Sequence, residues 1–140
     1  MKTKNILIKI LILLIITLNN SCDLENPSEP ENEGKLPPII ESAYKSKTTI
    51  KVGELINLSV TASDPQGLDL YYMWTFGAVD GENFVNGNFV SSEELKNVTW
   101  QAKEIWSNVP DKNYGVIKFR CDVYNMYNTA TTYIQLTVYP

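Results

Sequence analysis

Two stretches of strict two-residue alternation, one on each side of a tight turn, constrain this chain more than any other feature. From Leu55 to Ala62 every second residue is apolar, and the same pattern from Leu70 to Phe76 places Trp74 on the apolar side. Between them, Asp64-Pro65-Gln66-Gly67 has typical turn chemistry. Such alternation buries one face of a β-strand. A strand pair cannot cover its own apolar side, so a second layer must pack over Trp74.

The rest of the chain after residue 37 continues in short strands and turns, without a long segment of helical period. Gly53-Glu54 is predicted to be a turn, and residues 93–96 could form a single turn. Short strands with frequent turn signals are typical of a β-sandwich, and we expect about seven strands. In addition to the strands at 55–62 and 70–76, we expect a first edge strand over 39–52 and irregular strands and turns over 77–90. Alternating strands are expected at 98–102, 117–123 and 130–138.

The N-terminus has the features of a secretory signal, which we assign to residues 1–21. Lys2, Lys4 and Lys9 precede a short apolar run from Ile10 to Leu18, and Cys22 follows a small residue. This arrangement resembles the signal of bacterial lipoproteins, particularly of the Bacteroidetes type. The resemblance implies that Cys22 becomes the first residue of the mature chain and carries the lipids. The alternative is a simple secreted protein that is cleaved nearby.

Residues 22–36 are predicted to be a flexible tether. After the cysteine they contain five acidic residues and two prolines and almost nothing apolar, so they cannot bury enough surface to become ordered. Asp23 and Glu25 resemble the export signal that sends such lipoproteins to the outer face of the outer membrane. This resemblance implies cell-surface exposure; a solvated spacer on the periplasmic face is the alternative.

The charge and cysteine content limit the possible partners. The whole chain carries 12 basic and 16 acidic residues; removal of residues 1–21 takes away three lysines, which leaves nine basic residues and a formal charge of −7. This balance disfavours nucleic acid and anionic lipid headgroups. With Cys22 acylated, only Cys121 remains, so no intrachain disulfide can form. Cys121 lies on the apolar side of its strand, and we expect it to be buried.

Residues 37–140 resemble a PKD-like domain of the immunoglobulin-like class. The resemblance rests on Gly53-Glu54 and the Ala62–Gly67 turn, on Tyr72 and Trp74, and on two later strand motifs, Val98–Ala102 and Phe119–Val123. It implies an all-β, immunoglobulin-like (PKD-like) β-sandwich in which the third strand and the last two share a sheet. It also implies that the apolar positions from Ile117 to Val123 pack against Trp74 and the Leu55–Ala62 strand.

The sequence offers little for catalysis. It contains no histidine, which excludes histidine-based acid–base or metal chemistry, and one core cysteine cannot form a thiolate cluster. The best carboxylates are Asp64, Asp69, Asp80 and Glu82. The Asp64–Asp69 segment is similar to Asp-rich calcium loops of cadherin-like relatives, but Asp-Pro-x-Gly is also ordinary turn chemistry. We therefore predict no enzyme and no cofactor, with Asp64 and Asp69 as weak calcium candidates.

One face of the predicted sandwich is a candidate for binding. Tyrosines and two cations point away from the core on the strands that the resemblance places in one sheet, and Tyr with Arg is typical of binding hot spots. Aromatic faces also suit sugar rings, although tyrosine has a high strand propensity of its own. Thr75 shares this face, whose candidate ligand residues are Tyr71, Met73, Lys118, Arg120, Tyr124, Tyr133, Gln135 and Tyr139.

These features predict a non-catalytic lipoprotein of the outer membrane, anchored through Cys22, whose domain binds a glycan or a partner protein at the cell surface. The alternative is a structural spacer, or an accessory subunit of an outer-membrane complex, without a ligand of its own. Trp106 and Tyr114, in the predicted connection after the 98–102 strand, could add a loop contact or plug one end of the sandwich.

Overall fold

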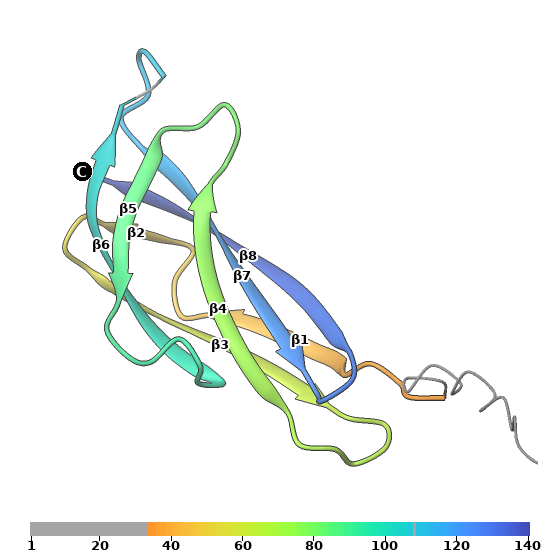
Figure 1. The fold of residues 1–140 in the computed structure, drawn as a ribbon. Helices are drawn as coiled ribbons and strands as arrows, with labels where there is room; N and C mark the ends of the chain where they lie inside the picture. The colour runs from red at the N-terminus through yellow and green to blue at the C-terminus, as the bar shows by residue number, and fades with distance from the viewer. Residues whose placement is uncertain (1–33, 108) are drawn as a thin grey trace, which may run out of the picture. The chain divides into compact units, whose positions relative to one another are not determined.

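The computed structural model describes residues 34–107 and 109–140, and these form two four-stranded β-sheets packed face to face (Figure 1). We call them the β1 sheet, of order β1-β3-β6-β5, and the β8 sheet, of order β2-β8-β7-β4. The all-β sandwich prediction is thus confirmed. The strands are β1 (Ile39–Lys45), β2 (Thr49–Lys51), β3 (Leu55–Ser63), β4 (Tyr71–Ala78), β5 (Phe84–Phe89), β6 (Asn97–Trp106), β7 (Gly115–Tyr124) and β8 (Thr129–Tyr139).

The signal peptide, Cys22 and residues 23–33 of the predicted tether lie outside the described residues. In the part of the chain that the structure describes, no helix is long and apolar enough to cross a membrane.

Alternation in the sequence becomes alternation in burial. On β7 every second side chain from Ile117 to Val123 is fully buried, while Lys118 and Arg120 between them point outward. This confirms the prediction that Cys121 is a core residue. Both sheets contribute to one core: Ile50, Ile56, Leu58, Val60, Trp74, Val85, Val98, Trp100, Ala102, Ile117, Phe119, Cys121, Val123, Ile134, Leu136 and Val138.

Two tryptophans, one from each sheet, anchor this core. Trp74 on β4 is buried beside Cys121, its register partner on β7, so it lies next to the β7 side chains in the same sheet. Trp100 on β6 is equally buried and meets Phe119 edge-on, with ring centroids 5.1 Å apart. The sequence predicted Trp74 as the central aromatic residue of the core. Trp100 fills the core from the opposite sheet in the same way.

Two predicted strand relationships are wrong. The segment 39–52 is not one edge strand, because β1 pairs antiparallel with β3 whereas β2 runs parallel to β8 in the other sheet. The chain changes sheets between them, which gives eight strands among the described residues instead of about seven. The strands on either side of the Asp64–Gly67 turn also do not pair: β3 and β4 belong to opposite sheets.

The turns themselves form as predicted. The amide of Gly67 donates to the carbonyl of Asp64 at 3.1 Å, and Gly67 has a φ of 72°, a conformation that favours glycine. The amide of Glu54 closes the Gly53-Glu54 turn on Lys51 at 3.0 Å.

The segment 77–90 is more regular than predicted. Asn86-Gly87, which has the character of a turn in the sequence, lies inside β5 at the point where its register with β6 shifts; the extra, unpaired residue of this β-bulge is Lys103 on β6. A Cβ atom at Gly87 would lie 2.0 Å from Cζ2 of Trp100, so only glycine lets this backbone pass over the indole ring.

The segment between β5 and β6 covers the free edge of β4. Residues 92–95 turn through a bond from the Leu95 amide to the Ser92 carbonyl, at 3.4 Å. The backbone amide of Trp74 donates to the Glu93 carbonyl at 3.0 Å, and the Trp74 indole Nε1 donates to the Leu95 carbonyl, also at 3.0 Å. The bond from the Trp74 backbone amide satisfies a backbone edge group of β4 that would otherwise be open to another chain.

Candidate binding face

All eight residues predicted as a ligand face lie on the outer side of the β8 sheet. They alternate with the buried side chains of β4, β7 and β8, so the parity of each strand decides which face they occupy. They do not form one uniform surface, because the strand register divides them into three groups: Lys118, Arg120, Tyr133 and Gln135 in the middle; Tyr71, Met73 and Tyr124 toward one end; and Tyr139 at the other.

The middle group, which we call the Tyr133 cluster, is held by direct cross-strand neighbours. Arg120 stands opposite Tyr133, and Lys118 stands opposite Gln135. The Lys118 ammonium lies 4.3 Å from the centre of the Tyr133 ring, within the range of a cation–π contact. Tyr133 nevertheless keeps 53% of its surface exposed, and Arg120 is also exposed.

Asp122 is the residue of this face that the sequence analysis left out of the candidate site. Its Oδ1 accepts a bond from Arg120 Nε at 2.9 Å and one from the Thr131 hydroxyl at 2.6 Å. The Asp122 carboxylate therefore raises the pKa of the Arg120 guanidinium. Asp122 has the same strand parity as Lys118 and Arg120, and that parity was the signal that could have identified it.

The tyrosines at the two ends of the sheet pack on other partners. Tyr71 and Tyr124 are register partners and stack with ring centroids 5.8 Å apart, and the row that contains Met73 and Asp122 separates them from the Tyr133 cluster. Tyr139 lies at the opposite end, where its ring centroid is 5.9 Å from that of Tyr114.

Cations outnumber acids on this face. Lys51 stands beside Tyr139 on β2, and the Lys45 ammonium donates to the Gln135 carbonyl at 2.6 Å, which brings a charge from β1 to the edge of β8. On the outward positions of the sheet itself, three cations, Lys51, Lys118 and Arg120, are balanced by one acid, Asp122, in a chain whose overall charge is negative. Neither Lys45 nor Lys51 could be assigned to the face from the sequence, because both belong to the segment that changes sheets.

The weak calcium candidates lie at the end of the sandwich where β3, β4, β7 and β8 are connected. Asp64 Oδ1 accepts the amides of Gln66 and Leu68, at 2.8 and 3.1 Å, and Oδ2 accepts the Asn125 side-chain amide at 2.8 Å. The bond from Asn125 is the main cause of the lowered pKa of Asp64. Asp69 is exposed, and among the described residues no three acidic or cysteine side chains gather as a metal site would require.

The buried Asn125 ties this end together and fixes the start of the described chain. Its amide also donates to the Leu36 carbonyl at 3.1 Å, and its Oδ1 accepts the amides of Tyr127 and Asn128. Residues 34–36, assigned to the tether from sequence, are thus hydrogen-bonded to the domain.

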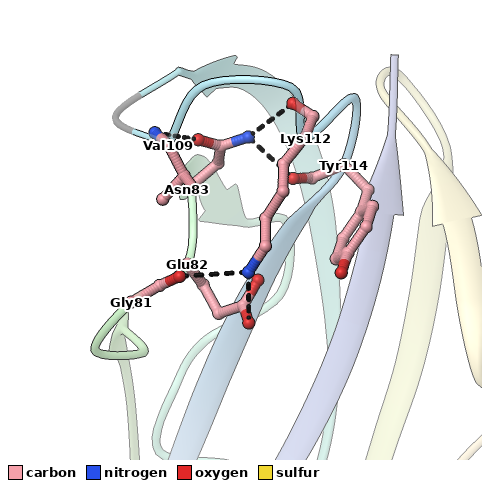
Figure 2. A network of polar contacts seen from close by, with 6 residues as sticks. All are labelled: Gly81, Glu82, Asn83, Val109, Lys112 and Tyr114. Carbon is pink, nitrogen blue, oxygen red and sulfur yellow. Dashed lines mark hydrogen bonds and ion pairs between the residues drawn. The ribbon is translucent and has the colours of Figure 1, made fainter.

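Figure 2 shows the polar network at the other end of the sandwich, around the buried Asn83. The Asn83 side-chain amide donates to the carbonyls of Lys112 and Tyr114, and its Oδ1 accepts the Val109 amide. The Lys112 ammonium meets Glu82 Oε1 at 2.9 Å, and this bond raises the pKa of Lys112. Glu82, a candidate carboxylate in the sequence, thus joins two loops.

Trp106, predicted to lie in a connection, is the last residue of β6. It is 53% exposed and packs against Phe84, with ring centroids 5.4 Å apart. Asp80 is exposed in the nearby turn between β4 and β5.

The Cys121 thiol has low reactivity. Burial raises the pKa of its thiol to about 12, with a smaller contribution from Asp122. Because the thiolate is the reactive form, this side chain packs as a small apolar group.

Comparison with known proteins gives no further assignment: the chain matches no protein-family model and no curated protein.

Proposed function

We propose that this chain is a lipid-anchored, non-catalytic protein of the bacterial outer membrane, whose immunoglobulin-like (PKD-like) domain binds a partner protein at the cell surface. The strand order supports the fold assignment. When the strands other than β2 are lettered A to G along the chain, the two sheets read A-B-E-D and G-F-C, the arrangement of immunoglobulin constant domains. Trp74, buried on the C strand, is a second feature of that class.

The Tyr133 cluster is the observation on which the binding proposal rests. Tyr133 and Arg120 are cross-strand neighbours on the outer face of a rigid sheet, and both are exposed. Tyrosine and arginine are enriched among residues that dominate binding energy, because they offer a large surface and directional hydrogen bonds. A sheet interior also holds these side chains more precisely than a loop would.

A protein partner fits this cluster better than a glycan does. A sugar binds tyrosine by stacking on an open ring face, but the Lys118 ammonium already lies 4.3 Å from the centre of the Tyr133 ring. The surplus of cations on the face instead favours an acidic protein surface, since complementary charge steers association and selects partners. We expect binding to weaken as salt is added, because exposed charges are screened.

The anchor and the location rest on the sequence. Lys2 to Leu18 have the features of a signal peptide, Cys22 is the proposed acylation site, and Asp23 and Glu25 follow it. We propose that this segment carries the protein to the outer membrane and, through the acidic residues after Cys22, to the cell surface.

A structural spacer without a ligand is the second candidate, and one observation favours it. The bonds from Arg120 and Thr131 to Asp122, and the stack of Tyr71 on Tyr124, pair many polar and aromatic groups of the face within the sheet. A face that satisfies itself in this way needs no partner.

The experiment is a binding comparison against arrays of outer-membrane proteins and of glycans. Wild-type protein, Tyr133→Ala and Tyr44→Ala are compared; Tyr44 is a matched control because it is an exposed tyrosine on β1, in the other sheet. The proposal predicts a protein ligand that the Tyr133→Ala variant binds at least tenfold more weakly, about 1.4 kcal/mol, and that Tyr44→Ala binds normally. Absence of any ligand for the wild type would favour the structural spacer. A glycan ligand would refute the proposal that the partner is a protein.

A further inference from the structure

We infer that the end of the sandwich at which the chain arrives from Cys22 docks onto the lipid bilayer, through an apolar patch formed by Leu36, Leu68, Tyr71 and Met126. The inference rests on the proposed lipid anchor. It assigns to these residues a membrane contact that is separate from the Tyr133 cluster and its partner.

The patch surrounds an open hollow of about 190 Å³, lined by Leu68, Asp69, Tyr71 and Met126. Met126, at the tip of the connection between β7 and β8, is 73% exposed, and Leu36 and Tyr71 are each about half exposed. An unbranched Met, a Leu and a Tyr with a polar tip are side chains that suit the boundary between headgroups and acyl chains.

The start of the described chain is fixed at this same end. The Leu36 amide donates to Gln66 Oε1 at 3.0 Å, and the Gln66 side-chain amide donates to the Gly34 carbonyl at 3.2 Å. Asn128 holds the Lys35 carbonyl at 3.0 Å. Figure 1 shows that β1 begins beside the connection between β7 and β8, so the chain reaches the domain next to Met126.

The length of chain outside the structure brings this end to the membrane. Eleven residues separate Cys22 from Gly34, and such a segment can span at most about 40 Å even when fully extended. An attached domain experiences a high effective concentration of membrane surface, so a weak apolar contact is sufficient for docking.

The charges at this end indicate which kind of lipid surface fits. Asp64 and Asp69 lie beside the patch, and Lys35, the nearest described cation along the chain, already lies 5.0 Å from the Tyr127 ring centre. Acidic neighbours oppose anionic headgroups, so docking depends on apolar insertion into a zwitterionic interface and changes little with salt.

The test uses the full-length acylated protein in phosphatidylcholine vesicles that contain a nitroxide-labelled phospholipid. An environment-sensitive dye is placed on Met126→Cys, and a control dye on Asp80→Cys, an exposed residue in the turn at the opposite end. In the acylated protein the Cys22 sulfur carries the lipid, and Cys121 is buried with its pKa raised to about 12, so the introduced thiol is the one that reacts. Adding Leu68→Ser to the Met126→Cys protein tests the patch itself, with the melting temperature as a check on folding.

The inference predicts that the dye at 126 shifts to shorter emission wavelength and is quenched by the labelled lipid, that the dye at 80 is not, and that Leu68→Ser reduces the quenching. Flotation of the protein with the vesicles measures the anchor separately. If the protein floats but the dye at 126 remains in water, docking is refuted and the anchor stands. If the protein is not acylated and does not float, the anchor proposal fails and the docking inference fails with it.

Discussion

At the scale of single residues, Trp74 connects the core to the edge of the β8 sheet. Its ring is buried, while its indole nitrogen and its backbone amide both bond to the segment between β5 and β6. One residue therefore fills the core and closes an edge. Its place on the apolar side of a strand was predictable from alternation, but its partners Glu93 and Leu95 were not, because they follow it by about twenty residues and carry no pattern.

Replacement of Trp74 by alanine is expected to lower the free energy of unfolding by about 3–5 kcal/mol, because it leaves a large cavity. Trp106→Ala is the matched control and should have little effect, since Trp106 is 53% exposed. Urea unfolding followed by circular dichroism measures both variants. Equal stability of Trp74→Ala and wild type would refute the assignment of Trp74 to the core.

Asn125 and Asp64 make the domain sensitive to acid. The pKa of Asp64 is lowered, chiefly by the bond from Asn125. A carboxylate with a lowered folded-state pKa contributes stability above its unfolded pKa of about 3.9, and this contribution is lost as the pH falls through the folded value. In Asn125→Ala the pKa of Asp64 rises toward its ordinary value, so the contribution of this group shrinks.

We therefore expect Asn125→Ala to lower the free energy of unfolding by about 2–4 kcal/mol at pH 7, because several buried hydrogen bonds are removed. Below about pH 4 the variant should lose less additional stability than the wild type does. Melting temperatures of wild type and variant between pH 7 and pH 2 provide the test. Parallel curves for the two proteins would contradict the coupling of Asn125 to Asp64.

At the scale of elements, Gly87 shows how one side chain restricts the residue type on a neighbouring strand. Gly87 passes over Trp100 with no room for a Cβ atom, whereas Gly77 on β4 has nothing within 4 Å of that position. Glycine is required at the first position by contact and not at the second.

Gly87→Ala is expected to lower the melting temperature by several degrees or to prevent folding, because the Cβ atom would overlap both Trp100 and the Gln101 carbonyl. Gly77→Ala should leave the melting temperature nearly unchanged. Differential scanning fluorimetry of both variants checks this, and equal tolerance at both positions would mean that Gly87 does not pack tightly against the indole ring.

Strand existence was predictable from local pattern, but strand partnership was not. The alternation in β3, β7 and β8 identified these strands and their buried faces. The division of 39–52 into β1 and β2 depends on which distant edge each half meets, β3 or β8. Asn86-Gly87 is a turn by local chemistry, but it lies inside β5, where it pairs with β6 and Gly87 packs against Trp100.

At the scale of the whole molecule, the candidate face illustrates the same limit. Parity placed all eight predicted residues on one side of the β8 sheet, yet register decided which of them are neighbours. The register places Arg120 opposite Tyr133 and places Tyr139 at the far end of the sheet. Lys51 joined the face only because the chain changes sheets between β1 and β2, and Lys45 reaches the edge of β8 from the other sheet.

In our proposal, the end with Leu36 and Met126 contacts the bilayer, and the outer face of the β8 sheet receives a partner. At the opposite end Asn83 fixes two loops together, and the exposed Trp106 lies nearby.

The most direct test of the proposed binding face is photo-crosslinking on intact cells. A photoreactive phenylalanine analogue replaces Tyr133 in one full-length protein and Tyr44 in another, and irradiated cells are examined for covalent adducts. The account predicts an adduct with a partner protein from position 133 and none from position 44. Absence of an adduct at 133, or equal adducts at both positions, would contradict the assignment of the binding face to the Tyr133 cluster.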